Sequence, residues 1–556
     1  MHRLLFFSAF FGAYFSLFSQ HSNLPLNHEA NLIYEKEIME TNIHTSFKPL
    51  IKSSVNKKVN LDSLLNYKFP NNWNNWYKRK LFSEHLIIIK GEDFNITASP
   101  IIHFSKGKET VSGTNTFTNT RGFIIEGDIG KSVSFYSSFA ENQAIFPNYI
   151  DSSIRINKVV PGQGYARDFK STGFDYAMAS GYVAIKPAKH FTVQFGHGKH
   201  FIGNGYRSLL LSDNAFNYPF LRIQTSFWKL QYTNLYAEMQ DINYFENNGL
   251  DNYDQLGYAK KYMSAHYLSV NVNSNLTISI FESVIWRANH APGARGFDVN
   301  YLNPIALFRP LEFSINSPDN ALVGINMKYK LPFKSSLYGQ FVLDEFSLDE
   351  MKSGDDWFGS KYGYQIGAKM HDVFGLKNLT LQTEYNLVRP YTYAHHNPMQ
   401  NYAHYNQPLA HPLGANFSEK LLIINYRKDR WVARAQLMIA KYGGKILNDK
   451  TSYGNDLYMS TGNFAEESGV QHVGIGRPDR NNDGVLDEFG MKMYQGNLTN
   501  INYFQLNVGY IINPSTNFKI DLGITKRNFL NEIDETNTMF YTISLKTDLF
   551  NHYYDF

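Results

Sequence analysis

The sequence predicts an all-β protein, namely a transmembrane antiparallel outer-membrane β-barrel of about 18 strands with a small N-terminal periplasmic or plug segment. Three observations predict this fold. Apolar and polar residues alternate over segments of about ten residues. Short and long connections follow one another between these segments. Aromatic residues make up 16% of the chain, with 38 Tyr and 43 Phe, although its mean hydropathy is slightly negative.

The composition excludes several other classes of protein. The formal net charge is +4 over 556 residues, so no strong basic field indicates a nucleic-acid partner. The chain has no cysteine, which rules out disulfides, thiolate metal sites, cysteine nucleophiles and a lipidated N-terminal cysteine. A barrel with an apolar outside, a polar inside and aromatic girdles explains many aromatics at low hydropathy.

The first element is an expected export signal over residues 1–19. His2 and Arg3 give it a basic start, Leu4 to Phe18 form an apolar run, and Ser19 is a small residue at a plausible cleavage point. The run is shorter than the roughly 20 residues that a membrane-spanning helix needs, so a secretory signal is preferred.

The second element, residues 20–90, differs from the rest of the chain. It has short mixed patterns, of which residues 29–41 fit a helix, and a Trp/Asn-rich stretch at 71–76. We interpret it as a periplasmic or plug segment. The third element, residues 91–556, is the expected barrel.

Within the barrel region, strands are predicted from a period of two. In residues 504–512 and 518–525 every second side chain is apolar, and in 379–387 the same alternation is interrupted only at Thr383. A soluble sandwich alternates in the same way, so the connections decide between the two folds. Short connections fall at 128–131, 187–189, 272–275, 331–334, 374–378, 427–430 and 513–516, and long ones at 144–171, 200–218, 240–260, 288–317, 346–358, 390–415 and 442–498.

Short turns on one side and long loops on the other are the organisation of an outer-membrane barrel. This count gives about 18 strands from near Phe94 to near Phe550, with both chain ends on the periplasmic side and the loops at the cell surface. The last alternating segment, residues 541–549, precedes a C-terminal Phe556, which resembles the insertion signal of outer-membrane proteins.

The longest loop contains a calcium-like pattern. Oxygen ligands at alternate positions, a glycine at the sixth and a carboxylate at the ninth are typical of the first part of a calcium loop. Gly490 stands where the bidentate carboxylate of that pattern belongs, and Glu488 is a substitute at non-standard spacing. We predict a structural calcium ion held by Asp479, Asn481, Asp483, Val485 (through its carbonyl), Asp487 and Glu488. The alternative is an acidic turn on a solvated loop.

Two further stretches contain residue types that are common in active or metal sites. His395, His396, His404 and His411 lie in one loop, but their spacing does not match a compact metal site, so a polar loop folded into the barrel mouth is favoured. The glycine-rich run at 196–208 leads back to a strand rather than to a helix. It therefore indicates a chain that bends over the lumen rather than a phosphate cradle. No Ser–His pair stands out by its spacing, so we expect no enzymatic activity.

Three stretches carry a resemblance to a known family: Gly196–Asp213 (GHGKHFIGNGYRSLLLSD), Asn300–Phe313 (NYLNPIALFRPLEF) and His404–Phe417 (HYNQPLAHPLGANF). They resemble the Wzi-like capsule-assembly barrels, and more narrowly the Bacteroidetes branch that includes the gliding-motility protein RemB. The resemblance implies an 18-stranded outer-membrane barrel that holds capsular polysaccharide or takes part in surface gliding. It does not match any individual sugar-binding residue of that family to a position in this sequence.

The expected function is therefore non-enzymatic binding of surface polysaccharide or of motility-machinery proteins through the extracellular loops, with outer-membrane lipid around the wall. Trp286, Trp357, Tyr402 and Tyr405 are the candidate carbohydrate-binding residues, because aromatic faces stack on sugar rings. The alternative for these residues is an aromatic girdle, which suits Trp286 at a strand end. The alternative function is a passive porin-like channel, and polar inward residues such as Gln382 and Glu384 fit either function.

Overall fold

The structure is a computed structural model that describes residues 21–243, 257–288, 296–304, 319–345, 349, 354–462, 476–481 and 483–556. The expected export signal at 1–19 lies outside the described residues. In the described part of the chain, no helix is both long enough and apolar enough to cross a membrane.

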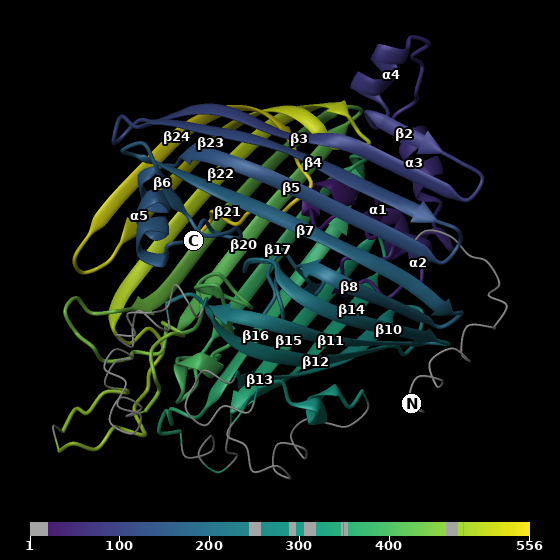
Figure 1. Cartoon of the computed structure of the whole chain (residues 1–556). Helices are drawn as coiled ribbons and strands as arrows, with labels where there is room; N and C mark the ends of the chain where they lie inside the picture. Colours follow the sequence, from purple (N-terminus) through teal and green to yellow (C-terminus); the bar gives the residue numbers. More distant parts are fainter. Residues whose placement is uncertain are drawn as a thin grey trace, which may run out of the picture.

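The wall of the molecule is a closed antiparallel barrel of 18 strands, which confirms the predicted fold and strand number (Figure 1). The wall strands are, in chain order, β3 (Phe94–Glu109), β4 (Asn115–Ile129), β5 (Val133–Ile145), β7 (Gly173–Ala188), β8 (Phe191–Gly198), β10 (Tyr218–Phe227), β11 (Leu230–Asp241), β12 (Ala259–Asn271), β13 (Leu276–Arg287), β14 (Asn320–Leu331), β15 (Ser335–Glu345), β16 (Lys361–His371), β17 (Leu379–Val388), β20 (Phe417–Lys428), β21 (Trp431–Gly444), β22 (Asn497–Asn513), β23 (Phe518–Leu530) and β24 (Glu535–Thr547).

The remaining elements belong to the plug, to the connections or to the seam of the barrel. They are α1 (His28–Met39), β1 (Phe47–Lys48), α2 (Lys52–Asn56), α3 (Leu61–Lys68), α4 (Trp76–Phe82), β2 (Ile87–Lys90), α5 (Asn148–Asn157), β6 (Arg167–Phe169), β9 (Phe201–Ile202), η1 (Val299–Leu302), η2 (Val373–Gly375), η3 (Pro398–Gln400), β18 (Ala403–His404) and β19 (Gln407–Pro408).

The alternation in sequence separates the two faces of the wall. Ile366, Leu522 and Ile543 point outward, and more than half of each side chain is exposed. Gln340, Gln365 and Gln436 point inward and are buried. An apolar outer face and a polar inner face suit a barrel surrounded by lipid.

The connections also divide as expected, with two refinements. One end of the barrel, here called the turn end, carries the short hairpins between β4–β5, β7–β8, β10–β11, β12–β13, β14–β15, β16–β17, β20–β21 and β22–β23. The hairpin at 227–230 is one that the sequence pattern missed. The opposite end, here called the loop end, carries the long connections, together with short ones at 110–114 and 531–534.

The barrel closes at an irregular seam between its first and last strands. β24 pairs with β3 only over His103–Glu109 of β3. Nearer the turn end, β2 pairs instead with Asn95–Ala98 of β3. The wall is therefore completed by a strand from the N-terminal segment, because β24 ends at Thr547 and the chain then leaves the sheet.

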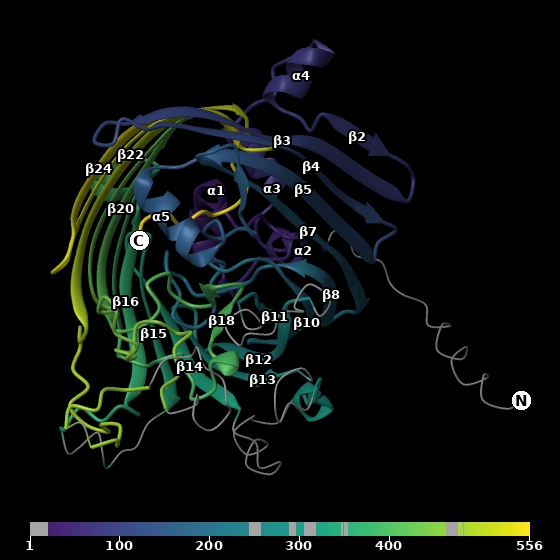
Figure 2. The same ribbon diagram turned by 60° about the vertical axis from the view of Figure 1, so that its left-hand side comes forward.

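The C-terminal tail leaves the wall. The last wall strand ends at Thr547, two residues before the end of the predicted alternating segment, and residues 548–556 fold into the lumen, where both ribbon views place the C-terminus (Figures 1 and 2). The period of two breaks after Leu549, where Phe550 is also apolar, and the tail supplies Asn551 and Asp555, whose side chains have partners inside the barrel. These polar groups would be unsatisfied against lipid.

Candidate binding surface and closed lumen

The turn-end half of the lumen is filled by the N-terminal segment. Figure 2 shows α1 inside the ring of strands. Asn27 caps α1 by accepting a hydrogen bond from Ala30 N at 2.8 Å. Ion pairs hold α1 to the wall: Glu35 to Lys369 at 2.6 Å and Glu29 to Lys519 at 2.5 Å. Burial alone would raise the pKa of Glu35, but the Lys369 ammonium lowers it to about 2, so this pair is ionised.

Two loop-end connections fold inward and meet the plug. Residues 199–217 enter the lumen, where β9 pairs with β1 of the plug. Residues 389–416 lie beside them, and the hydroxyls of Tyr393 and Tyr402 donate to the carbonyls of Leu209 and Leu210 at 2.7 and 2.6 Å. The glycine-rich run is thus a chain that bends over the lumen. A Cβ at Gly205 would lie 2.3 Å from Glu384 Oε2, so this approach requires glycine.

At the centre of the lumen, Arg207 joins four parts of the chain. Its Nη2 lies 2.9 Å from Glu419 of β20 and 3.1 Å from Asp555 of the tail, and all three side chains are at most 3% exposed. His411 Nε2 lies 2.9 Å from the second oxygen of Glu419. The backbone N–H groups of Tyr206 and Arg207 donate to Glu384 of β17 at 2.8 and 3.1 Å.

The C-terminal tail packs between the plug and the inward loops. Asn551 donates its backbone N–H to Leu26 O at 3.0 Å and its side-chain amide to Asp213 at 2.8 Å. Tyr553 donates to the other oxygen of Asp213 at 2.8 Å. Together with the Asp555–Arg207 pair, these contacts make the tail a second plug within the barrel.

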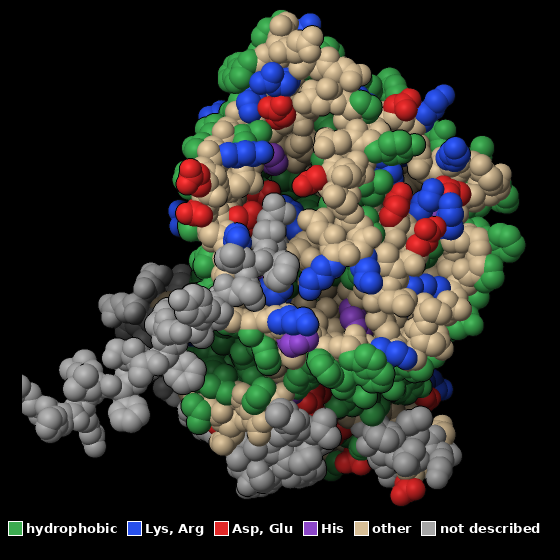
Figure 3. Space-filling model, turned by 90° about the vertical axis from the view of Figure 1, so that its right-hand side faces the viewer, with side chains coloured by type: hydrophobic (Ala, Val, Ile, Leu, Met, Phe, Trp, Pro, Cys, Tyr) green, Lys and Arg blue, Asp and Glu red, His purple; other side chains and the backbone are tan. Residues whose placement is uncertain are grey.

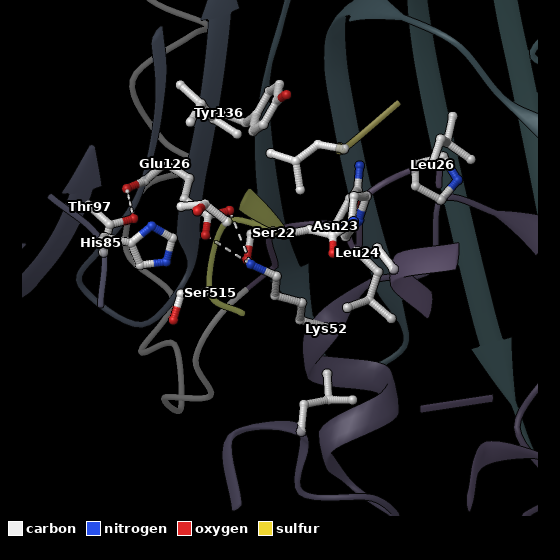
Figure 4. Close-up of a pocket in the computed structure, with 18 of the residues that line it drawn as sticks. Ser22, Asn23, Leu24, Leu26, Lys52, His85, Thr97, Glu126, Tyr136 and Ser515 are labelled. Atoms are coloured by element: carbon white, nitrogen blue, oxygen red, sulfur yellow. Dashed lines mark hydrogen bonds and ion pairs between the residues drawn. The ribbon is translucent and has the colours of Figure 1, made fainter. Parts of the chain in front are cut away.

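A cavity remains between the plug and the β3–β7 side of the wall, with a volume of about 610 Å³. Figure 3 looks onto the turn end, where charged side chains of both signs surround a hollow. Inside the cavity, Lys52 of α2 lies 3.0 Å from both carboxylate oxygens of Glu126, and His85 and Tyr136 lie nearby (Figure 4). Its lining continues to Lys199 and Asp213, which belong to the inward loop.

The described parts of 354–361 and 476–497 lie together at the loop end. Phe358 N donates to Glu488 O, and Gly490 N donates to Asp355 O, both at 2.8 Å. These two bonds hold the segment that carries Trp357 beside the segment that carries Phe489. Trp357 is half-buried and Phe489 is 42% exposed. The Trp357 ring packs edge-on against Phe358 at 5.4 Å between centroids, and Trp357 and Phe489 both remain accessible from outside.

The other three candidate aromatics are buried, which corrects their expected place on an exposed surface. Tyr402 and Tyr405 lie in the packed lumen, where the Tyr405 ring lies 4.7 Å from Phe216. Trp286 is on the outward face of β13 but only 1% exposed, because its Nε1 donates to Gly296 O at 2.8 Å and its ring lies 4.8 Å from Tyr301.

The residues that cover Trp286 belong to the long connection between β13 and β14, which was expected at the cell surface. Residues 296–304, including η1, lie against the outer face of β11–β13, where the short teal helix appears below β13 in Figure 1. Tyr236 OH donates to Leu302 O at 3.0 Å, and Ser264 Oγ donates to Tyr301 O at 2.8 Å. This sector of the wall is covered by the chain itself. Part of the connection expected to act at the surface therefore packs against the side of the barrel.

The residues predicted to bind calcium lie on one turn. Both oxygens of Asp479 accept backbone N–H groups, from Asp483 at 3.2 Å and Gly484 at 2.8 Å, and Asp483 accepts from Val485 N at 2.9 Å. Asp487 forms an ion pair with Arg480 at 2.9 Å. Asn481 lies on this turn, and the backbone carbonyl of Glu488 accepts the hydrogen bond from Phe358 N. Among the described residues, no three His, Asp or Glu side chains converge as a metal site would require.

The histidines of the 390–415 stretch serve the packing of an inward loop, which is the favoured interpretation. His404 Nδ1 accepts from Gln240 N at 2.9 Å, and its Nε2 donates to Asn217 O at 3.2 Å. Burial lowers the pKa of both His395 and His404 to about 3. Each of these rings is therefore neutral near pH 7.

The central cluster was the main feature that the sequence did not single out. Arg207 lies within the glycine-rich stretch 196–213, but its partners come from β20 and from the C-terminus, far away in the chain. The available signal was a pair of carboxylates on inward strand positions, Glu384 and Glu419, because two acidic groups facing one lumen require a cation.

No protein-family model matches the chain, and no curated protein sequence matches it. Among solved structures, the fold is similar to Wzi from Escherichia coli, described as an outer-membrane protein involved in group 1 capsule assembly and a carbohydrate-binding β-barrel. The TM-score is 0.53 at 12% identity, over 95% of this chain and 100% of that chain. OprD of Pseudomonas aeruginosa (TM-score 0.39, 11% identity, 84% and 97% covered) and OccAB2 of Acinetobacter baumannii (0.40, 8%, 82% and 97%) are more distant. The fold is that of outer-membrane barrels.

Proposed function

We propose that this chain is a non-enzymatic outer-membrane barrel whose loop end faces the cell exterior and binds surface polysaccharide. The observation that carries the proposal is the filling of the lumen by the plug, the inward loops and the tail, with Arg207 of one inward loop paired to Glu419 of the wall and Asp555 of the tail. A barrel closed in this way leaves its outer surface, rather than its interior, to carry function. The likeness in fold to a carbohydrate-binding barrel supports the proposal that the ligand is a polysaccharide.

The proposed contact surface contains Trp357 and Phe489. Aromatic rings stack on the apolar faces of sugars, and the neighbouring Arg480, Asp355 and Glu488 carry polar groups that suit hydroxyls. A polysaccharide presents both kinds of surface along its length. Motility-machinery proteins are the alternative partners of the same surface.

We expect Trp357→Ala and Phe489→Ala each to weaken binding of the purified protein to capsular polysaccharide from its own cells by about fivefold to tenfold, since aromatic contacts contribute about 1 kcal/mol or more. Binding is measured by surface plasmon resonance. The matched control is Tyr405→Phe, a buried tyrosine that should leave binding unchanged. Unaltered binding in both surface variants would remove this surface from the proposal.

The cellular role is tested by deleting the gene and scoring capsule retention and spreading on agar. Loss of capsule would support polysaccharide retention, and loss of spreading with the capsule intact would support a motility role. If neither changes, the proposed function fails.

Calcium binding by the 479–488 turn stays a prediction. Calorimetric titration of the purified protein with calcium tests it, with Asp483→Ala as the control. We expect a saturable heat that Asp483→Ala abolishes, because Asp483 would supply a ligand at the centre of the pattern. A titration without binding heat in the unmodified protein would remove calcium from the account.

A further inference from the structure

Helix α4 stands outside the perimeter of the barrel at the turn end. Both ribbon views show it apart from the rest of the plug, beyond β2 and the edge of the wall (Figures 1 and 2). Its C-terminal end is held by two hairpins of the wall. Asn513 donates to the carbonyls of Lys80 and Glu84 at 3.0 and 2.9 Å, and Arg430 donates to Phe82 O at 3.1 Å. The position of the helix at the rim is therefore fixed.

Three large apolar side chains of α4 are exposed to solvent. Trp76 is 63% exposed, Tyr77 59% and Leu81 48%, on a helix of 7 residues. Trp73, just before the helix, packs against Phe82 with ring centroids 5.0 Å apart. Contiguous apolar groups of this kind mark a contact with a partner or a membrane.

The apolar surface continues into the part of the wall that faces lipid. The strand that follows α4 is β2, on which Ile87 and Ile89 are 49% and 50% exposed on the outer side. Ile88, between them, lines the internal cavity. Because β2 is paired with β3, the helix is joined directly to the membrane-facing sheet.

The charge on α4 selects among the surfaces that could cover it. Lys78, Arg79 and Lys80 follow one another, and Glu84 is the acidic partner of Arg79 and Lys80 at 3.0 and 3.1 Å. Lys78 lies over the Trp73 ring at 5.5 Å. Aromatic, leucine and basic side chains together are the composition of segments that lie at a membrane surface beside anionic headgroups.

We propose that α4 is a membrane-surface anchor: its Trp76, Tyr77 and Leu81 side chains enter the interfacial layer at the turn end, and its basic side chains contact anionic phospholipid headgroups. The anchor links the plug to the bilayer as well as to the wall. This inference does not depend on what the loop end binds.

The absence of cysteine allows a direct test with single-cysteine variants. Leu81→Cys and the control Tyr67→Cys are spin-labelled and reconstituted into vesicles of phosphatidylethanolamine and phosphatidylglycerol. Tyr67 is 83% exposed on α3 and lines a pocket together with the charged side chains of Lys36 and Asp372. We expect the label at 81 to collide more with oxygen and less with a water-soluble nickel chelate than the label at 67.

Two further arms make the outcome decisive. In the Leu81→Cys background, Trp76→Ala with Tyr77→Ala should abolish the oxygen preference, while resistance of the barrel to unfolding in detergent reports that the wall is intact. Nickel accessibility at 81 equal to that at 67 would overturn the anchor. An oxygen preference of the same size in vesicles without phosphatidylglycerol would overturn the part played by anionic headgroups.

Discussion

Arg207 is the residue on which the closed lumen depends. Its guanidinium is the shared partner of Glu419 and Asp555, and its backbone N–H binds Glu384. We expect Arg207→Ala to lower the free energy of unfolding by about 3–5 kcal/mol, because carboxylates would be left buried without their cation. Urea unfolding followed by tryptophan fluorescence measures the change.

The control for this substitution is an arginine in an exposed pair. Arg155, 47% exposed and paired with Asp151 at 2.8 Å, should cost at most about 1 kcal/mol when replaced by alanine. Equal effects of the two substitutions would contradict the special role of Arg207.

His404 makes the stability of the inward loop depend on pH. Burial lowers its pKa from 6.5 to about 3 in the folded chain, and protonation of Nδ1 would place a proton against the N–H of Gln240. The unfolded state therefore binds more protons between these values, and stability falls as the pH falls below 6.5.

The predicted size of this effect is about 2 kcal/mol between pH 7 and pH 5. His404→Asn should flatten the pH dependence by that amount, measured by urea unfolding at both pH values. An unchanged slope would show that the ring gains its proton at the same pH in both states.

The sequence predicted residues less well than strands, for a physical reason. Period-two patterns are local, so the strands that carry Leu522 or Ile366 could be identified within a few positions. Whether Trp286, Tyr402 and Tyr405 are buried depends on which segment folds over them. The segments that cover the two tyrosines come from distant parts of the chain. An aromatic residue in a loop is equally compatible with exposure and with packing.

At the scale of the element, the C-terminal tail and the plug both fill the lumen. The tail contacts Leu26, Asp213 and Arg207, so it joins the plug to the inward loop. Removing residues 551–556 should both lower stability and open a path through the lumen, because Tyr553 and Asp555 are buried there.

Single-channel recording in planar bilayers tests this prediction. We expect no large, steady conductance from the full chain and measurable conductance from the shortened one. The control is Phe556→Ala, which keeps the tail in place through Asp555 and should stay closed. A large, steady conductance from the full chain would instead favour the porin alternative.

At the scale of the whole molecule, strand number, direction and the division between short and long connections could be predicted because a closed barrel imposes them on every strand. The filling of the interior could not. Long connections predict only that chain is available at one end. They do not say whether it folds inward, as 199–217 does, packs outward against the wall, as 296–304 does, or bonds to a neighbouring connection, as 488–491 does.

The position of the last residues has a practical consequence for anyone who handles this protein. A purification tag or fluorescent partner added after Phe556 would start inside the barrel, beside Arg527, whose Nε donates to the Phe556 carbonyl at 2.9 Å. Its bulk would compete with the wall for the space that the tail fills. The turn at 110–114, where Val111 is 64% exposed, is the better site for such an insertion.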